Sequence, residues 1–569
     1  GLPLLANPPE WRLGGPDAAS AKLEHVPADG PGFETAWRIT TTATTSAENR
    51  IVVTAVNAIP IAGGDALLLR FWARTLETQA ADGRGRLRFS KQAAFAAPAF
   101  TGRPAEGWKL MVSTVPARLS FAAGQHTFTL AVGGTAPQTL EVGGFEFLNY
   151  RRTLQTHQLP YACATYEGRA PEAAWRARAE ADIEKYRKAN LAVQVVDSSG
   201  APVAGVPVRV KMLAHDFEWG TAAGEPRING ASNPDNDRYR ESLLAMFNHA
   251  TLDNALKWPN WEAAGGRQRA LSAVDWLISR GLSVRGHAVH WPSWTNSPAR
   301  IRTEYESKLA SLGSAEADRW LREQCETRVR DAVSALRGRI HEWDLVNEPV
   351  GNRDFMRILG DSVMDDWFRI ARETDPEALF FINENGVEQD GNAKTQSFFE
   401  IVRDLLARGA PVGGVGIQAH VGAISIPSYL RALDRFASLG LPITITEFDM
   451  VTPDARLQAE FTRDFLTATF SHHAVKGFLM WGFWDNNHWL HDAPLYYRDW
   501  TLKPSGQVWS DLIYRQWWTD EERLSDAGGA VAVRGFLGRY EVSAGGVAVP
   551  VLLKHEGAEV KLVVGGPAN

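Results

Sequence analysis

Cysteine is scarce in this chain of 569 residues, and long apolar runs are missing from it. The two cysteines, Cys163 and Cys325, lie far apart in the sequence, which excludes a cysteine-rich zinc module and a disulfide scaffold. One bridge between them stays open, but two free buried thiols are the better interpretation. No apolar stretch approaches the roughly 18 residues that a membrane-spanning helix needs. We therefore expect no association with a membrane.

An excess of charge of either sign is also missing. The 60 Lys and Arg residues nearly balance the 66 Asp and Glu residues, the net charge is −6, and like charges form no blocks. This argues against a nucleic-acid-binding surface or an acidic tail. The chain begins with Gly1 rather than methionine, which leaves a cleaved secretion signal open, and we expect a secreted, periplasmic or cell-surface protein. Tryptophan is plentiful, and its flat ring suits stacking on sugars as well as core packing.

The two ends of the sequence are predicted to be β-structure. Residues 1–150 hold short β-rich runs separated by clusters of Gly, Pro, Asn and Asp, which is typical of a β-sandwich or jelly roll. Residues 151–212 are expected to form a linker helix, over 169–190, and a β-hairpin. Residues 518–569 return to β-like alternation and are expected to form a small C-terminal β appendage.

Residues 213–517 carry a different pattern, in which short apolar runs alternate with longer amphipathic stretches. This pattern indicates repeated βα units. Eight such units in about 300 residues predict a TIM (β/α)8 barrel. The expected strands are Phe217–Thr221, Ala250–Trp258, Leu282–Trp291, Ile340–Asn347, Leu379–Asn383, Val415–His420, Ile443–Phe448 and Gly477–Trp484.

Two of the expected strands lead into glutamates, Glu348 and Glu447, at the end of the barrel where active sites form. Cleavage of a glycosidic bond needs two opposed carboxyl groups, one protonated to donate to the leaving oxygen and one ionised to attack or to activate water. A single strand-end glutamate is as easily a solvated or salt-bridged loop residue. Two of them, with amide, imidazole and indole groups at four other strand ends, favour a glycosidase site.

Over residues 213–517 the sequence resembles glycoside hydrolase family 10, the endo-β-1,4-xylanase family. Any single motif is weak, because Asn-Glu-Pro also occurs in cellulase- and mannanase-like barrels, but the ordered set is specific. The motifs are Asp-Asn-Ala-Leu-Lys-Trp at 253–258, Arg-Gly-His at 285–287, Trp-Asp-Leu-Val-Asn-Glu at 343–348, Gly-Ile-Gln-Ala-His at 416–420, Ile-Thr-Glu-Phe-Asp at 445–449, and Trp481 with Trp489.

The resemblance implies catalytic roles for the matching residues. Glu348 would be the general acid/base and Glu447 the nucleophile of a retaining double displacement, which needs carboxyl groups about 5–5.5 Å apart. Asn347 would bind the 2-hydroxyl of the sugar at the cleavage point. His420 would lie beside Glu447 and be oriented by Asp449. Glu447 and Asp449 can both reach this imidazole, because residues two apart on a strand share a face.

The remaining matches imply contacts with the substrate. Asn254, Lys257 and His287 would hold sugar hydroxyls on the non-reducing side. Trp481, Trp489 and Trp291 would form stacking surfaces for sugar rings. Gln418 would add a polar contact. Plainer roles stay open for three of these residues: a structural salt bridge for Lys257, packing for Trp291 and an interior network for Gln418.

The sequence departs from the family pattern in three places. Asp253 stands where the family usually has Glu, the segment 290–294 is compact, and Leu490 follows Trp489 where the family often has Arg. These changes leave both glutamates in place but leave the length and decoration of the substrate open.

Residues 1–150 resemble, more weakly, the jelly-roll carbohydrate-binding modules that precede such barrels. Trp37, Trp72 and Trp108 are its candidate stacking residues, and core packing is the favoured alternative for each.

Together these observations predict a monomeric endo-1,4-β-xylanase that needs no cofactor or metal and acts on xylan or xylo-oligosaccharides. No His, Cys, Asp and Glu pattern has the spacing of a catalytic metal site, and no Gly-rich loop is in phosphate-binding register. Two alternatives stay open. One is a β-glycanase for glucan or for decorated or short xylan-derived substrates; the other is an inactive carbohydrate-binding barrel, against which the presence of both glutamates argues.

Overall fold

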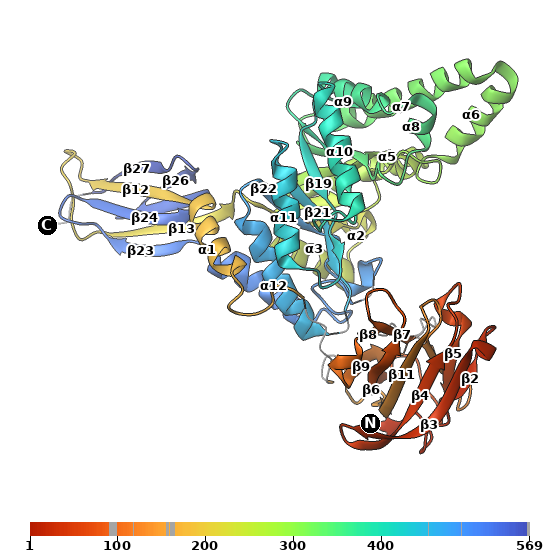
Figure 1. The fold of residues 1–569 in the computed structure, drawn as a ribbon. Coiled ribbons are helices and arrows are strands. Elements are labelled where there is room, and N and C mark those ends of the chain that lie inside the picture. Colours follow the sequence, from red (N-terminus) through yellow and green to blue (C-terminus); the bar gives the residue numbers. More distant parts are fainter. Residues whose placement is uncertain are drawn as a thin grey trace. The chain divides into compact units, whose positions relative to one another are not determined.

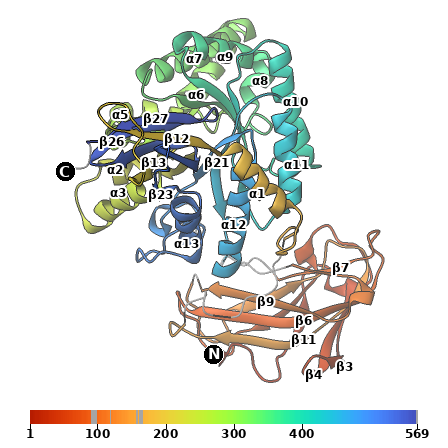
Figure 2. The same cartoon turned by 90° about the vertical axis from the view of Figure 1, so that its left-hand side faces the viewer.

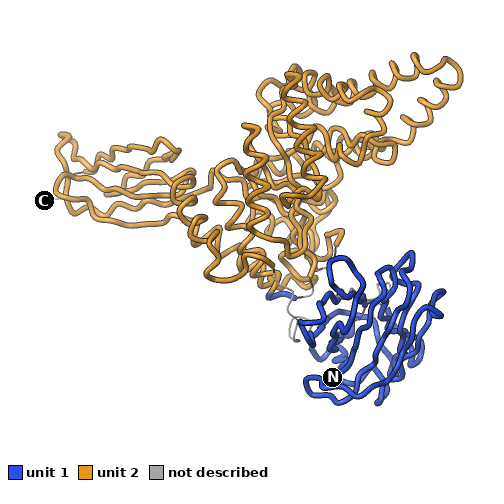
Figure 3. The backbone as a smooth tube through the Cα atoms, viewed as in Figure 1, with its two compact units in different colours: residues 1–164, 453–456 blue, residues 165–452, 457–569 orange. Residues whose placement is uncertain are grey.

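The computed structural model of the protein describes residues 1–89, 99–117, 119–154, 159, 166–452, 454–490 and 492–565. The backbone divides into two units, residues 1–164 with 453–456 and residues 165–452 with 457–569 (Figure 3). Cys325 is a buried free thiol, whereas Cys163 lies outside the described residues. Among the residues described, no helix is both long and apolar enough to cross a membrane.

The first unit is a β-sandwich, as the sequence predicts. One sheet has the order β3-β4-β11-β6-β9, with β1 paired to β11, and the other has the order β2-β5-β10-β7-β8. Apolar side chains of both sheets, among them Phe71, Phe128 and Phe147, form one core. The strands in Figure 1 are β1 Leu2–Pro3, β2 Arg12–Gly14, β3 Ala21–Gly30, β4 Phe33–Thr41, β5 Val52–Val56, β6 Ala66–Thr78, β7 Gly85–Phe89, β8 Ala99–Gly102, β9 Lys109–Pro116, β10 Thr127–Ala131 and β11 Gln138–Asn149.

The three tryptophans considered for sugar stacking, Trp37, Trp72 and Trp108, are all half-buried. Trp37 packs against the sandwich core. The guanidinium of Arg74 lies 4.4 Å from the centre of the Trp108 ring, and Phe33 meets that ring edge-on. A role for these rings in sugar binding stays a prediction.

The second unit contains the predicted (β/α)8 barrel. Its strands run in parallel in the order β14-β15-β16-β17-β18-β19-β21-β22, and β22 pairs with β14 to close the ring. The short strand β20, His420–Val421, pairs with the end of β21. The barrel strands are β14 Glu218–Ala223, β15 His249–Leu252, β16 Ser283–His290, β17 Glu342–Asn347, β18 Leu379–Glu384, β19 Gly414–Ile417, β21 Ile443–Met450 and β22 Val475–Met480.

Helices surround these strands (Figure 1 and Figure 2). The sequence expectation for the second strand was too long: β15 ends at Leu252, because the polar residues that follow form a loop and Pro259 lies in the first turn of α4. The helices are α1 Trp175–Tyr186, α2 Glu225–Asn229, α3 Pro234–Met246, α4 Trp258–Glu262, α5 Gly266–Ser279, α6 Ala299–Leu312, α7 Ser314–Ala335, α8 Asp354–Leu359, α9 Val363–Thr374, α10 Ala393–Ala407, α11 Ile426–Ala437, α12 Ala455–Ser471 and α13 Pro504–Asp511.

The barrel strands are buried on both faces, which is why they read as nearly continuous apolar runs. β17 and β21 are buried at every position. The structure explains the glycine of the Arg-Gly-His motif at 285–287, because a Cβ atom at Gly286 would meet the ring of Trp343 at 2.1 Å. The glycine therefore leaves room for the Trp343 ring, in a register that places Arg285 opposite Glu342 and His287 opposite Asp344.

The expected hairpin within residues 151–212 is wrong. Strands β12 and β13 lie in two different sheets, β24-β12-β27 and β23-β13-β25-β26, and each pairs with C-terminal strands. Local alternation predicts strands but carries no information about partners more than 300 residues away. The strands are β12 Lys188–Val196, β13 Pro207–His215, β23 Asp520–Leu524, β24 Ala530–Phe536, β25 Gly538–Ala544, β26 Val547–Leu553 and β27 Ala558–Val563.

Candidate active site

A cleft of about 720 Å³ opens at the carboxyl ends of the barrel strands. Every side chain that the sequence analysis assigned to catalysis or substrate binding lines this cleft. Asp449, the predicted orienting residue, is hydrogen-bonded to two of them, His420 and Trp489. Side chains expected from six separate strand ends are therefore brought together. The predicted residues in the wall are Asn254, Lys257, His287, Trp291, Asn347, Glu348, Gln418, His420, Glu447, Trp481 and Trp489.

Glu348 directly follows β17 and adopts a φ of +54°, in the left-handed region that non-glycine residues rarely occupy. The hydrogen bond from its backbone N–H to the carbonyl of Asn383, at 2.7 Å, holds this turn against β18. The side chain is half-buried. Its two carboxyl oxygens accept hydrogen bonds from Gln418 Nε2 at 3.0 Å and from Asn352 Nδ2 at 3.1 Å.

Glu447 lies in β21 and its side chain is buried. Asn383 Nδ2 donates to its Oε1 at 2.8 Å, and His420 Nε2 lies 3.2 Å from its Oε2. The ring of His287 comes within 3.8 Å of Oε1. The two glutamates thus differ in their surroundings: Glu447 is enclosed by an amide and imidazoles, whereas Glu348 contacts amides and faces the cleft.

His420 carries the positive charge beside Glu447. Burial alone would lower its pKa, but the hydrogen bonds to Asp449 (Nδ1 to Oδ2, 2.9 Å) and Glu447 outweigh burial and raise the pKa to about 10. The ring is therefore an imidazolium that donates from both nitrogens. Trp489 Nε1 also donates to Asp449 Oδ2 at 2.9 Å, which ties an exposed cleft wall to this charged group.

The orientation of the Asn347 amide is set by its neighbours. Its Oδ1 accepts hydrogen bonds from Asn383 Nδ2 at 2.9 Å and from Gln418 Nε2 at 3.3 Å. The amide nitrogen is then the group that can donate to a hydroxyl in the cleft. Gln418 belongs to the interior network and also donates to Glu348, while its contact with the substrate stays a prediction.

Lys257 and His287 form the other side of the cleft. Lys257 Nζ donates to Asn254 Oδ1 at 2.9 Å and lies 5.4 Å from the centre of the Trp291 ring. Burial lowers its pKa, while nearby carboxylates, including Glu447, oppose that shift. The ring of His287 stands nearly perpendicular to Trp481 at 5.0 Å. Trp489 is 62% exposed, as a surface for stacking on a sugar ring has to be.

Three residues to which the sequence analysis assigned no role organise this site. Asn383 binds both Asn347 and Glu447. Asp344 accepts from His287 Nδ1 at 2.9 Å and from Arg285 at 2.6 Å, and the guanidinium and the imidazole lower the pKa of its carboxyl although burial opposes this. A signal was available for Asn383, which is a polar residue near the end of an apolar strand. Asp344 and Arg285 lie within predicted strands, where polar side chains in the barrel interior carry no such signal.

Comparisons with known proteins identify a family and several relatives that match the barrel region. Residues 210–507 match the family model described as glycosyl hydrolase family 10. The chain is 32% identical over 374 residues to the anti-sigma-I factor RsgI6 of Acetivibrio thermocellus (65% of this chain, 46% of that protein). It is 26% identical over 364 residues to endo-1,4-beta-xylanase 1 of Arabidopsis thaliana (63% and 36%), and 29% identical over 322 residues to endo-1,4-beta-xylanase B of Thermotoga neapolitana (53% and 87%).

Among solved structures, xylanase 10B from Thermotoga maritima has 26% sequence identity and a TM-score of 0.47, over 53% of this chain and 96% of that one. Xylanase 10B from Thermotoga petrophila, solved in complex with xylobiose, has 26% identity and a TM-score of 0.46, over 53% and 95%. The chain spans less than half the length of RsgI6 and of the Arabidopsis protein.

Replacing His420 with asparagine tests the charged state of this ring. The pKa of His420 is about 10 in the folded protein against 6.5 for a free histidine, so its contribution to stability is fully present below about pH 6.5 and is lost as the pH rises toward 10. The free energy of unfolding of the wild type should therefore exceed that of H420N by the largest margin near pH 6. Chemical denaturation at several pH values up to 10 measures this margin.

The exposed His555 offers a matched control. The margin between the wild type and H555N should stay small and nearly constant over the same pH range. A margin for H420N that is flat, or that grows with pH, would contradict the imidazolium assignment.

Proposed function

Because the chain belongs to glycosyl hydrolase family 10, we propose that it is an endo-1,4-β-xylanase that cleaves internal xylosidic bonds with retention of configuration. Glu348 acts as the general acid/base and Glu447 as the nucleophile. The observation that carries this proposal is the presence of these two carboxyl groups, in unlike surroundings, in one cleft.

In the first step, a carboxylate oxygen of Glu447 attacks the anomeric carbon and forms a glycosyl ester. The bond from that carbon to the leaving oxygen breaks as Glu348 transfers its proton to the leaving oxygen. The imidazolium of His420 and the amide of Asn383 donate hydrogen bonds to Glu447 and fix its direction. The backbone of Glu348 is in the left-handed conformation, and its carboxyl group lines the cleft as the proton donor.

In the second step, Glu348, now ionised, takes a proton from water as the water oxygen attacks the anomeric carbon. The ester bond breaks, and Glu447 is released as a carboxylate. Gln418 and Asn352 hydrogen-bond to Glu348 and keep it in place while its charge changes. Asn347, with its oxygen already engaged, donates from its nitrogen to the 2-hydroxyl, a contact that strengthens as positive charge develops on the sugar.

Xylan is the substrate class that the relatives support, since several of them are named endo-1,4-beta-xylanases. Asp253, which lines the cleft, and Leu490, which follows the lining residue Trp489, differ from the family pattern, so we expect them to influence specificity. We keep secretion as part of this proposal, because a polysaccharide substrate is found outside cells.

Product analysis on a panel of xylan, β-glucan and mannan tests the substrate class. The expected result is release of xylo-oligosaccharides of several lengths from xylan, with slower or undetectable cleavage of the other two polymers. Release of xylose alone would contradict internal cleavage. Faster cleavage of glucan or mannan would assign the enzyme to a different substrate while leaving the two-glutamate chemistry in place.

The variants E447A and E348A should fail in different ways. E447A removes the attacking atom and should lose nearly all turnover on xylan and on an aryl xyloside alike. E348A should lose about 10²–10⁴-fold on xylan, but an aryl glycoside with a good leaving group should still react in the first step and show a burst of phenol.

The exposed Glu377 provides a control, and E377A should match the wild type. Equal losses of E348A on both substrates would contradict its acid/base role, and near-normal activity of E447A would contradict its role as nucleophile.

A further inference from the structure

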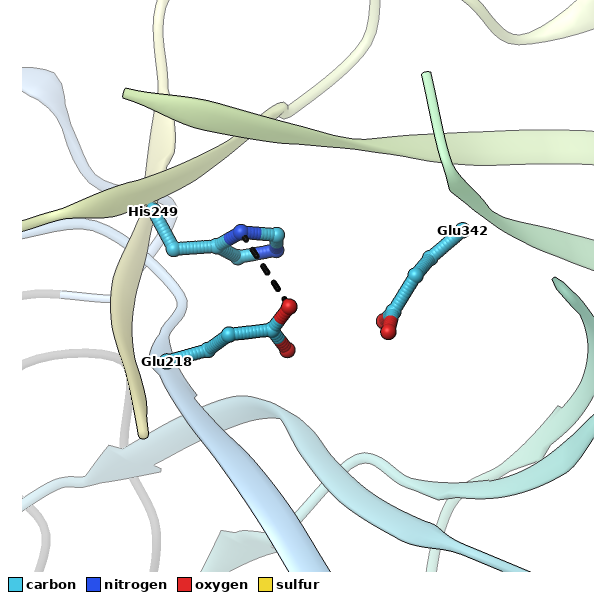
Figure 4. Close-up of side chains that lie close together, drawn as sticks. All are labelled: Glu218, His249 and Glu342. Carbon is cyan, nitrogen blue, oxygen red and sulfur yellow. Dashed lines mark ion pairs between the residues drawn. The ribbon is translucent and has the colours of Figure 1, made fainter. Parts of the chain in front are cut away.

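The opposite rim of the barrel carries a second group of ionisable side chains. Glu218, His249 and Glu342 are the first residues of β14, β15 and β17. One possible ligand atom of each lies within 4.8 Å of those of the other two. Parallel strands all start at the same rim, so the length of the strands separates this group, called here the rim cluster, from the cleft. In Figure 4 the imidazole ring and the two carboxylates point into a common space.

Two polar atoms of the rim cluster are buried and unpaired among the described residues. They are Nε2 of His249, whose side chain is 1% exposed, and Oε2 of Glu218. A buried polar atom without a partner costs free energy, and native proteins leave few of them. Both atoms are electron-pair donors, and they belong to residues that face each other. A cation that accepts both lone pairs would remove this cost.

Ser283 selects which nitrogen of His249 is free. His249 Nδ1 lies 2.6 Å from Ser283 Oγ, and that hydroxyl donates its own proton to the carbonyl of Asn248 at 3.4 Å. Ser283 therefore accepts the Nδ1 proton, and Nε2 is left with a lone pair. Histidines that bind metals are held in the same way, by a hydrogen bond from the nitrogen that does not bind the metal.

Two cations already contact Glu342. Arg285 Nη1 donates to Oε2 at 2.8 Å, and its side chain is 1% exposed, so this contact is fixed. The ammonium of Lys476 contacts Oε1, but the Lys476 side chain is 31% exposed and carries its ammonium on a flexible four-carbon stem. Lys476 can move outward and leave Oε1 free, while Arg285 keeps the carboxylate in position.

We propose that the rim cluster binds a divalent transition-metal ion, with Zn²⁺ as the representative, in exchange for the ammonium of Lys476. One imidazole nitrogen and two carboxylate oxygens suit zinc better than calcium or magnesium, which take sets made of oxygen alone. The ion would join the starts of three barrel strands. Because this rim serves stability rather than chemistry in such barrels, the metal is structural.

The site could not be predicted from the sequence, because its three ligands come from three different strands. Each is a single polar residue at the start of a strand, and no pair of them has the spacing of a known metal motif.

The test uses the full chain, stripped of metal with a chelator and then titrated with ZnCl2 in a calorimeter. We expect one zinc ion per chain at the rim and a rise in Tm with zinc concentration. H249F and E218Q should each weaken binding by more than about tenfold, whereas K476M, which removes the competing ammonium, should tighten it. H555N is the matched control and should bind as the wild type does. Millimolar Ca²⁺ or Mg²⁺ should not displace the zinc.

Several outcomes would overturn the proposal. Absence of zinc binding, or equal affinity in the wild type, H249F and E218Q, would mean that the rim cluster is only a network of ion pairs, or that zinc binds elsewhere, such as in the cleft. Weaker binding by K476M would contradict the exchange with the ammonium. K476M also keeps the test decisive if H249F fails to fold, because it leaves all three ligands in place.

Discussion

The proposed chemistry depends on one constraint: two carboxyl groups must face one cleft and carry different charges at the same moment. The structure surrounds the two groups differently. Glu447 is buried between the Asn383 amide and the His420 imidazolium, and the latter is itself held by Asp449. Glu348 accepts hydrogen bonds from the uncharged amides of Gln418 and Asn352 and lines the cleft. In the proposed mechanism, this difference in surroundings assigns the attack to Glu447 and the proton donation to Glu348.

A chain of buried ionisable side chains continues from this pair through the barrel interior. His287 lies 3.8 Å from Glu447 and binds Asp344, which binds Arg285. Arg285 in turn binds Glu342 at the opposite rim. Each member has a neighbour of opposite charge or a hydrogen-bond partner, which is what makes charges tolerable in an interior. Because removal of one member leaves its neighbours unpaired, the shape of the cleft and the stability of the barrel are linked.

Much of this could be predicted from the sequence because it lies in local patterns. Alternation of apolar runs and amphipathic stretches predicts the barrel, and the polar ends of the strands predict which side chains line the cleft. Glu348, His420 and Trp489 could be found in this way. The partners of β12 and β13 could not, because pairing across more than 300 residues leaves no local trace. Arg285 and Asp344 belong to recognised motifs, but no role could be assigned to them, because interior charges look the same in sequence whether or not they are paired.

The most direct measurement uses a 2-deoxy-2-fluoro xylobioside with a good leaving group. Fluorine at this position slows both steps, and the leaving group restores only the first, so a retaining enzyme accumulates its glycosyl ester. Intact mass spectrometry should show one added 2-deoxy-2-fluoroxylobiosyl unit, and peptide mapping should place it on Glu447. A protein that stays unlabelled while it still turns over xylan, or a label on any other residue, would contradict the assignment of Glu447 as the nucleophile.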